Sequence, residues 1–248
     1  MKYHVLASGS KGNCALIKSD DCCIMIDCGC TKKYILEKLQ ELGMTVNDID
    51  ALLLTHEHID HIRSISSFET LDVYCPFELK ERRGESIITP YVSFNIKGLN
   101  ILPIALSHDT KDTVGFIIED DEQKLVYVTD TGYISDKNIE YMKDSDYYII
   151  ECNHDIATLF ATNRPQYLKA RIISNYGHLC NEDCAEALCQ CVSNRTKEIV
   201  LAHISQEGNT TDLAYNTVVE TLSSIGINTS NLKITAATQF GLINGGTD

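Results

Sequence analysis

The sequence predicts a mixed α/β protein in which sheets pack together and helices cover them. Three observations support this fold class. Short apolar runs separated by turns fill the first half of the chain, helical patterns follow several of these runs, and no repeat, linker or shift in composition divides the 248 residues. Strand-rich sections that finish with helices are typical of layered sheet-and-helix architectures. We therefore expect one domain spanning residues 1–248.

The N-terminal part of this domain should begin with strands. Apolar runs predict strands at 3–7, 15–18 and 22–27, the third ending at Asp27. A helix is expected at 31–43, because Thr31 suits its N-terminal cap, apolar residues recur every three or four positions, and Gly43 suits its end. The next elements should be a buried strand at 51–55, a short helix through 62–68 and another short helix at 76–84.

The middle of the chain should form a run of strands, and helices should dominate the C-terminal part. Strands are expected at 86–88, 91–96, 100–106, 114–119 and 124–129, with the turn of a hairpin at 120–123. Further strands are expected at 147–151, 199–203 and, as the terminal strand, 232–236. Helical patterns cover 136–142, 166–175, 181–192 and 212–225.

The run from His56 to His61 is the strongest functional signal in the sequence. It reads His-Glu-His-Ile-Asp-His and directly follows the apolar strand at 51–55. Alternate residues of an extended segment point the same way, so His56, His58 and Asp60 can converge on one side. His61 breaks this alternation, which indicates that the chain turns into a helix there. Imidazole and carboxylate ligands together suit zinc, manganese or iron better than calcium or magnesium.

Three later strands also end in a polar residue that can bind a metal. His108 follows the strand at 100–106, Asp130 follows the strand at 124–129, and His203 ends the strand at 199–203. Sheet-based sites commonly lie at the carboxyl ends of strands. One such residue is more often a cap or a turn former, but the recurrence at strand after strand favours a common metal site.

Composition limits the functional class and the compartment. The net charge of −14 gives no basic footprint for a generic DNA-binding module, although bound divalent cations would still permit a nuclease. We expect a cytoplasmic protein without a membrane partner, because no apolar stretch approaches about 20 residues and no secretory signal is present. The eleven cysteines fit a reduced chain. A second metal site made by Cys180, Cys184, Cys189 and Cys191 is disfavoured, since their spacing does not match paired zinc knuckles.

The whole chain resembles the metallo-β-lactamase superfamily, whose signature is His-x-His-x-Asp-His after a strand. Within it, the chain is similar to the YycJ/WalJ group of small bacterial metallohydrolases, which are reported as 5′→3′ DNA exonucleases. The similar segments are 7–14, 26–29, 129–133, 151–155, 176–179 and 201–205. The RNase Z branch carries a long tRNA-binding arm between the positions of His108 and Asp130, where this chain has too few residues for it. The resemblance implies a four-layer αββα sandwich.

The resemblance also implies seven ligands for two divalent metal ions, which would be zinc, manganese or iron. One ion would be held by His56, His58 and His108. The other would be held by Asp60, His61 and His203, and Asp130 would bridge the two. No ligand position departs from the pattern of the superfamily. Asp27 would not bind a metal itself but would orient the histidine motif by hydrogen bonding, as ligating histidines require.

The implied reaction is hydrolysis of a phosphodiester by a metal-bridging hydroxide, with DNA as the substrate. Asp60 would accept the proton of the bridging water. His178 would lie near the substrate phosphate or the leaving group, although a structural hydrogen bond fits it equally well. For His154 we favour a structural or ligand-orienting role.

The glycine-rich turn at 9–13 is the candidate substrate-binding segment. Lys11 would contact phosphate through its ammonium group or through the backbone N–H groups of the turn, and Ser10 and Asn13 would contribute beside it. Without the resemblance, an ordinary tight turn would be the better interpretation.

Two other functions stay open at this level. The same metals would serve a small-molecule hydrolase that acts on a cyclic phosphodiester, a lactone or a thioester, and the acidic surface favours this alternative. A metal-dependent redox or binding protein is disfavoured, because neither a carboxylate ligand in the first cluster nor a flavin domain is present. The sequence does not indicate an oligomeric state, the physiological metal or the strand preference.

Overall fold

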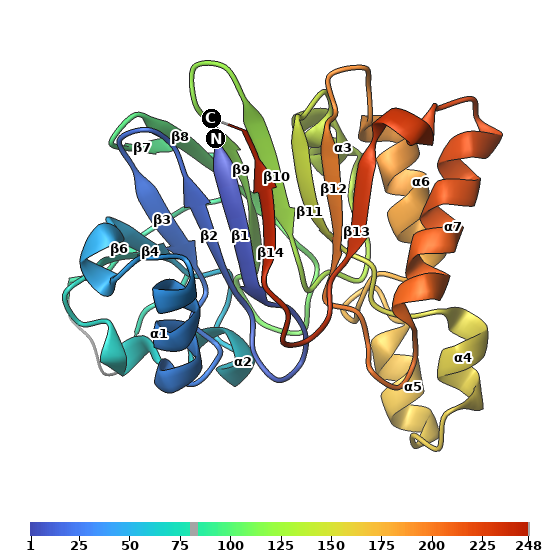
Figure 1. Ribbon diagram of the computed structural model, residues 1–248. Coiled ribbons are helices and arrows are strands. Elements are labelled where there is room, and N and C mark those ends of the chain that lie inside the picture. The colour runs from blue at the N-terminus through green and yellow to red at the C-terminus, as the bar shows by residue number, and fades with distance from the viewer. Residues whose placement is uncertain (80–83, 248) are drawn as a thin grey trace.

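Two seven-stranded mixed sheets form the centre of the computed structural model, which describes residues 1–79 and 84–247 (Figure 1). The first sheet has the order β14-β1-β2-β3-β4-β5-β6. Its strands are β1 (Lys2–Ala7), β2 (Cys14–Lys18), β3 (Cys23–Ile26), β4 (Ala51–Leu53), β5 (Asp72–Cys75), β6 (Ser86–Ile87) and β14 (Ile243–Gly246). The strands from β3 to β6 are parallel, and the β14-β1-β2-β3 side is antiparallel.

The second sheet has the order β13-β12-β11-β10-β9-β8-β7. Its strands are β7 (Phe94–Ile96), β8 (Leu99–Ala105), β9 (Val114–Glu119), β10 (Lys124–Val128), β11 (Tyr147–Glu151), β12 (Glu198–Ala202) and β13 (Lys233–Ala236). β10 to β13 are parallel, and the hairpins β7-β8-β9-β10 are antiparallel. The carboxyl ends of β8, β10, β11 and β12 therefore lie at one edge.

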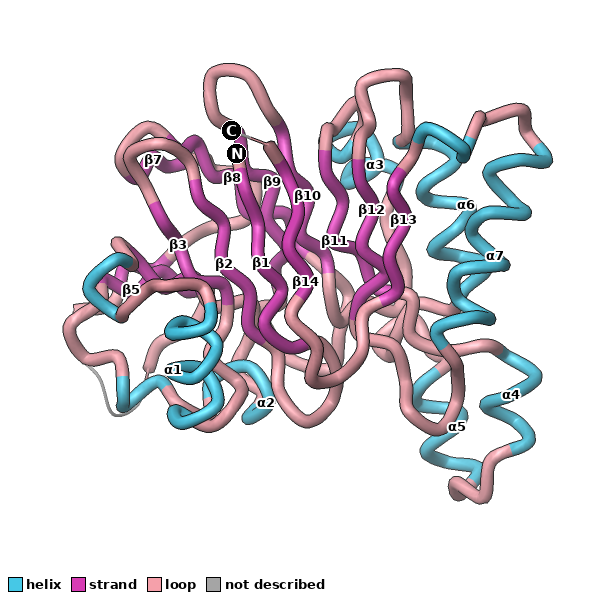
Figure 2. The backbone as a smooth tube through the Cα atoms, in the orientation of Figure 1, coloured by secondary structure: helices cyan, strands magenta, loops and turns pink. Residues whose placement is uncertain are grey.

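Alternation along the strands separates the core into layers. In β10, Leu125 and Tyr127 pack into the cluster shared by both sheets, whereas Val126 and Val128 pack towards the helices. Tyr3 of β1 and Tyr147 of β11 meet across the sheets, with ring centroids 5.7 Å apart. Because each sheet buries both faces, helices must cover the outer faces, and the predicted αββα sandwich is confirmed (Figure 2).

The helices cover the two sheets unequally. The described helices are α1 (Lys32–Glu41), α2 (Ile59–Ile62), α3 (Asp136–Met142), α4 (Ile156–Ala161), α5 (Gln166–Ile172), α6 (Asn181–Cys191) and α7 (Thr211–Ser224). α1 packs on the first sheet through Ile35 and Leu39, and Thr31 caps it as predicted by accepting a hydrogen bond from the Tyr34 N–H. α3, α6 and α7 pack on the second sheet. α4 and α5 form a pair beneath α6 and α7, at the same lower edge as α2 (Figure 1).

Several elements differ from the sequence predictions. The helix expected through 62–68 is α2 followed by a 3₁₀ turn at Ile65–Ser67, and β7 begins only at Phe94 because Tyr91 has a positive φ of 67°. The helix expected at 76–84 is wrong for its described residues, which are irregular; positions 80–83 lie outside the described residues. β5, α4 and β14 were not predicted, so the strand at 232–236 is not the terminal one. Within the described chain, the helices are too short or too polar to cross a bilayer.

Candidate metal centre

The predicted ligands meet at the edge where both sheets present the carboxyl ends of parallel strands. His56 lies three residues beyond β4 of the first sheet. His108, Asp130 and His203 follow β8, β10 and β12 of the second sheet. The potential ligand atoms form overlapping groups in which all atoms of a group lie within 4.8 Å of one another; these groups contain His56, His58, Asp60, His61, His108, Asp130 and His203, and also Glu151 and His178. The structure thus brings together all seven residues that the sequence analysis singled out.

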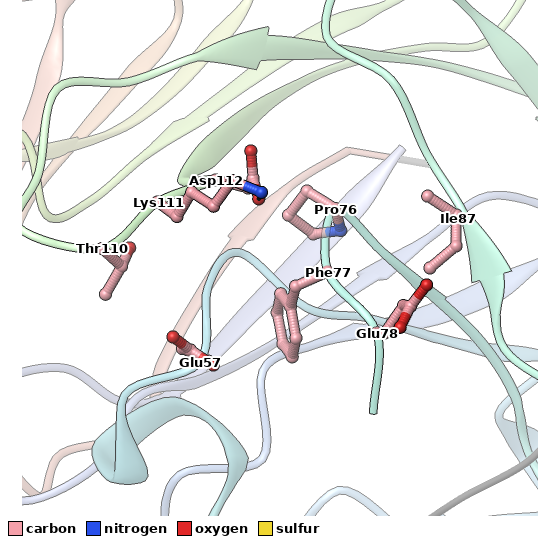
Figure 3. A pocket seen from close by; sticks show the side chains of 8 residues that line it. All are labelled: Glu57, Pro76, Phe77, Glu78, Ile87, Thr110, Lys111 and Asp112. Carbon is pink, nitrogen blue, oxygen red and sulfur yellow. The ribbon is translucent and has the colours of Figure 1, made fainter. Parts of the chain in front are cut away.

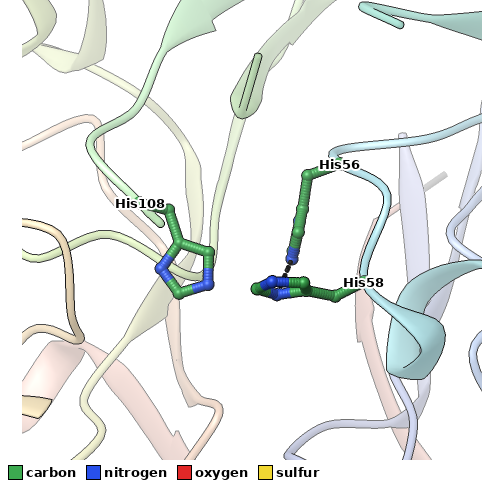
Figure 4. A group of neighbouring side chains, drawn as sticks. All are labelled: His56, His58 and His108. Atoms are coloured by element: carbon green, nitrogen blue, oxygen red, sulfur yellow. Dashed lines mark hydrogen bonds between the residues drawn. The ribbon is translucent and has the colours of Figure 1, made fainter. Parts of the chain in front are cut away.

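The first group consists of three imidazoles that face one another (Figure 4). His56 Nε2 and His58 Nδ1 are 3.1 Å apart, and the ring centroids of His58 and His108 are 5.0 Å apart. His108 Nδ1 donates to the Gly177 carbonyl at 3.0 Å, which leaves Nε2 for a metal. His56 Nδ1 likewise donates to Thr55 Oγ1 at 3.0 Å. The Nε2 atoms of His56 and His108 then carry the lone pair of a neutral imidazole, which is the donor that a divalent ion needs.

The second group combines imidazole and carboxylate. His61 Nε2 lies 3.0 Å from Asp130 Oδ2 and 3.9 Å from Asp60 Oδ2. His203 Nε2 is buried and has no hydrogen-bond partner among the described residues, and a buried polar atom without a partner is costly unless a ligand satisfies it. Asp130 also belongs to a group with His56 and His61, so it lies between the two sets. The donor atoms therefore fit two divalent cations.

Asp60 reaches this group by a route that differs from the predicted one. The expected alternation of an extended segment ends at His58, which is the N-terminal cap of α2, and Asp60 lies inside that helix. Backbone hydrogen bonds from two other segments hold the first turn of α2: Asp60 O accepts the Asn13 N–H at 2.8 Å, and His61 O accepts the Cys28 N–H at 2.7 Å. Gly29 makes this close approach possible, since a Cβ there would lie 1.5 Å from Asp60 O.

Asp27 occupies the position that was predicted for an orienting carboxylate. It is fully buried and accepts hydrogen bonds from His61 Nδ1 at 2.7 Å, from the Thr55 N–H at 2.9 Å and from the Thr55 hydroxyl. Through Thr55 it also orients His56. Asp27, Asp130 and His203 all have a positive φ, of 58°, 61° and 53°, and each lies within two residues of the end of a strand. Such backbone costs about 1 kcal/mol or more per residue and is typical of functional sites.

Glu151, to which the sequence analysis assigned no role, is a second orienting carboxylate. It ends β11 and is fully buried. Its Oε1 accepts hydrogen bonds from His178 Nδ1 at 2.8 Å and His203 Nδ1 at 3.0 Å, and its Oε2 accepts the Thr131 N–H at 2.7 Å. The signal that could have identified Glu151 was the one used for Asp130, an acidic residue at the end of a buried strand. His178 keeps its Nε2 for a cavity that it lines with His108 and His203.

Burial and the carboxylates divide the histidines into two classes. Burial lowers the pKa of His56 well below its usual value and also lowers that of His108. Burial alone would do the same to His203, but Asp130 and Glu151 outweigh it and raise the pKa to about 9. The pKa of His61 is raised for the same reason by Asp27 and Asp130. Without metal, the carboxylates thus retain protons on His61 and His203, which a divalent cation would displace.

The three residues predicted to bind substrate in the turn at 9–13 lie in different surroundings. Ser10 is exposed and lines the cavity beside His178, and Lys11 is exposed as well. Asn13 is instead fully buried, because its side chain bonds the Gly9 backbone and lies 3.0 Å from His61 Nε2; this position suits positioning rather than substrate contact.

The backbone N–H groups expected to hold phosphate are largely occupied by bonds within the fold. The N–H groups of Gly9 and Gly12 bond inside the turn, and that of Lys11 donates to Gln239 Oε1 at 2.9 Å. Gln239 Nε2 donates in return to Gly12 O. Gln239 was not identified from the sequence, since its contact joins residues more than 200 positions apart.

His154 and the cysteine cluster have no visible part in the centre. The His154 ring is buried and neither nitrogen has a hydrogen-bond partner among the described residues, so no contact there orients a ligand. Burial lowers its pKa to about 4. All eleven cysteines are free, and the described residues contain no cysteine group with the geometry of a metal site. Cys180 caps α6 instead.

Comparison with known proteins identifies the family. The model of the β-lactamase superfamily domain matches residues 23–204, a range that includes all seven candidate ligands. The chain belongs to the metallo-β-lactamase superfamily. It is 34% identical over 237 residues to exodeoxyribonuclease WalJ of Streptococcus pneumoniae serotype 2, covering 90% of this chain and 88% of the relative. It is 30% identical to exodeoxyribonuclease YycJ of Bacillus anthracis, covering 91% and 90%.

Solved structures agree with this assignment at the level of the fold. The metallo-β-lactamase fold protein YhfI from Bacillus subtilis superposes with a TM-score of 0.73 at 17% identity, covering 98% of this chain and 99% of that one. The short form of human tRNase Z superposes with a TM-score of 0.68 at 16% identity, covering 98% of both chains. Metallo-β-lactamase folds bind divalent metal ions, and the donor set described above suits such ions.

Proposed function

We propose that this protein is a metal-dependent phosphodiesterase that degrades DNA from the 5′ end. The observation that carries the proposal is the convergence of seven imidazole and carboxylate groups, from both sheets, into overlapping groups with ligand atoms within 4.8 Å. Relatives of nearly full length are named exodeoxyribonucleases, which supports DNA as the substrate. The net charge of −14 does not oppose this, because two divalent cations would make the centre locally positive.

The proposed ion sites follow the two groups of side chains. His56, His58 and His108 would hold one ion, and Asp60, His61 and His203 would hold the other. Asp130 would contribute to both. Zinc, manganese or iron suits this mixture of nitrogen and oxygen donors. Bound there, the two ions would lower the pKa of a water molecule and stabilise negative charge on a phosphoryl oxygen.

The residues of the chain supply orientation and proton transfer. Asp27 and Glu151 fix the rings of His61 and His203 by accepting their Nδ1–H groups. Asp60 is partly exposed, with its side chain 20% accessible, and is placed to accept a proton from attacking water. His178 donates Nδ1–H to Glu151 and lines the cavity, so its ring is positioned to contact the leaving oxygen.

A panel of substrates tests the proposal. The purified protein, loaded with Mn²⁺, is compared on 5′-labelled single-stranded DNA, duplex DNA, RNA and bis-p-nitrophenyl phosphate. We expect mononucleotides to be released from the 5′ end of DNA, and excess EDTA to abolish the release. Equal DNA degradation in EDTA would contradict a metal mechanism. Hydrolysis of the small ester alone would instead favour a small-molecule phosphodiesterase.

The cytoplasm is the compartment that we propose. Eleven free cysteines, of which ten are buried, suit a reducing environment better than an oxidising one. Localisation of a fluorescent fusion of the full chain, together with thiol titration of the protein in cell extract, would test this assignment.

A further inference from the structure

A cavity of about 180 Å³ opens beside the candidate metal centre and has a basic wall that the catalytic residues do not explain. One side is formed by His108, His178 and His203. The segment that contains α5 contributes Arg164 and Arg171 to the same lining. Two arginines therefore line a cavity that the candidate ligands His108 and His203 also line.

Each arginine is held by an acid from a loop that also carries a candidate ligand. Arg164 Nε donates to Glu207 Oε2 at 3.0 Å, and Glu207 follows His203 by four residues. Arg171 Nε donates to Asp109 Oδ2 at 2.6 Å, and Asp109 directly follows His108. The two ion pairs thus join the α5 segment to two different ligand loops.

Contacts other than these ion pairs also hold α4 and α5 in place. Lys169 is buried and its Nζ donates to the carbonyls of Phe160 and Thr162 at 2.6 and 2.7 Å, which ties α5 to the end of α4. The His178 N–H donates to Ile172 O at 2.9 Å and fixes the end of α5. The arginine pairs are partly exposed, and exposed ion pairs contribute little to stability. Their acids can therefore be replaced by another anion at low cost.

The local charge points to an anionic ligand. The segment 156–181 contains Arg164, Lys169 and Arg171 but no aspartate or glutamate, in a chain with a net charge of −14. A second cavity, of about 480 Å³, is lined by Glu57 of the histidine motif and has the opposite character (Figure 3). Its lining includes Lys111 but also three carboxylates, from Glu57, Glu78 and Asp112. A phosphate chain that leaves the centre is thus favoured towards α5.

We propose that Arg164 and Arg171 bind the phosphates that neighbour the scissile phosphodiester, exchanging Glu207 and Asp109 for phosphate oxygens as the nucleic acid strand enters. This inference rests on the proposed function, because it takes a polynucleotide as the substrate. The guanidinium group offers five N–H donors in a planar fork that matches phosphate oxygens in pairs. The bond to Glu207 uses one N–H of Arg164, so donors remain for a phosphate even before the exchange.

Binding without metal tests the inference independently of catalysis. The anisotropy of a fluorescent single-stranded oligonucleotide is followed in EDTA and low salt for the wild type, Arg164→Gln, Arg171→Gln and the double variant. We expect Kd to rise about tenfold in the double variant, and the slope of log K against log salt to become shallower by about 0.7 for each phosphate that is no longer bound. Glu207→Gln should tighten binding about twofold to threefold, because it removes the competing anion.

Arg195→Gln is the matched control. Arg195 is also ion-paired, to Asp146 at 2.7 Å, but it lies before β12, at the opposite end of the strand that leads to His203. Its Kd should equal that of the wild type, and thermal unfolding should show all variants folded. Absent wild-type binding, unchanged Kd in the folded double variant, or weaker binding by Glu207→Gln would overturn the inference.

Turnover separates this inference from the proposed function. With Mn²⁺, Arg171→Gln should raise KM for the oligonucleotide and leave kcat/KM for bis-p-nitrophenyl phosphate within about twofold. A purely structural role would lower kcat/KM equally for both substrates, and that result would refute the inference. If the wild type degrades no DNA at all, the proposed function fails, and the anisotropy measurement still decides whether the two arginines bind phosphate.

Discussion

Replacement of Glu151 by glutamine tests whether this buried carboxylate orients the candidate ligand His203 and the neighbouring His178. Glu151 accepts four hydrogen bonds: from His178 Nδ1 and His203 Nδ1 at Oε1, and from the N–H groups of Thr131 and Leu179 at Oε2. Glutamine has nearly the same shape but only one accepting oxygen. If that oxygen faces the histidines, the amide NH₂ faces the N–H groups of Thr131 and Leu179. If the amide is flipped, the NH₂ faces both imidazole N–H groups.

In either orientation, two N–H groups of the protein face the amide NH₂ of the glutamine in a buried site and lose their acceptor. An unsatisfied buried donor costs about 1–3 kcal/mol, and more when a charged acceptor is lost. The native carboxylate is charged at neutral pH, because His178 and His203 outweigh the effect of burial and lower the pKa of Glu151 to about 2. Loss of the charge also removes one of the two carboxylates that hold the ring of His203. Loss of such an orienting partner typically lowers metal affinity or activity about 10–100-fold.

The assay measures metal affinity by competition with a chromophoric chelator and kcat on bis-p-nitrophenyl phosphate. Glu151→Gln should bind the more weakly held ion about 10–100-fold less tightly and lose kcat by a similar factor. The control is Glu119→Gln. Glu119 is a partly exposed glutamate at the C-terminal end of β9, opposite to the end that lies near the candidate metal centre, so its replacement should leave metal affinity and kcat unchanged. Wild-type affinity and kcat in folded Glu151→Gln would refute the orienting role.

Three further variants test other parts of the site. His58→Ala should lower the metal content, measured by mass analysis, from about two ions per chain towards one, and unchanged content would exclude His58 as a ligand. Asp130→Asn should reduce kcat about a hundredfold or more while thermal unfolding changes little, and equal kinetics would reject the bridging role. His154 has a pKa of about 4, against 6.5 for a free imidazole, so it stabilises the fold above pH 6.5 and this contribution is lost as the pH falls towards 4. Between pH 6.5 and pH 4, the free energy of unfolding measured by urea titration should therefore fall by about 3 kcal/mol less in His154→Leu than in the wild type. An equal fall in both proteins would show that His154 is not held neutral.

The candidate ligand positions were predictable because their signal is local. A buried strand followed by one polar residue can be recognised in a window of a few residues, and this rule found His108, Asp130 and His203. The spacing from His56 to His61 is equally local. The family resemblance then implied how these residues would divide between two ions. Two of the groups in the structure contain the residues of that division, His56, His58 and His108 in one and Asp60, His61 and His203 in the other, whereas the group that joins Asp130 with His56 and His61 combines residues of both.

The orienting and positioning residues were harder to predict because their partners are distant. Glu151 contacts histidines 27 and 52 residues away, and the contact of Gln239 with Lys11 spans 228 residues. Two missed elements have the same cause. β14 has the sequence Ile-Asn-Gly-Gly, with a weak strand propensity, and exists because its backbone pairs with β1. α4 has six residues, too few to show a helical period, and is stabilised by the Asp155 cap and by Lys169.

The two buried carboxylates reveal how the centre is assembled. Asp27 follows β3 of the first sheet and orients His61 directly and His56 through Thr55. Glu151 ends β11 of the second sheet and orients His203 and His178. Each sheet thus contributes one carboxylate that holds two imidazoles. Each proposed ion site would take ligands that follow strands of both sheets: His56 and His58 with His108, and Asp60 and His61 with His203. The spacing of the candidate ligands within each site therefore depends on the apolar cluster that packs the two sheets together, although none of these ligands belongs to that cluster.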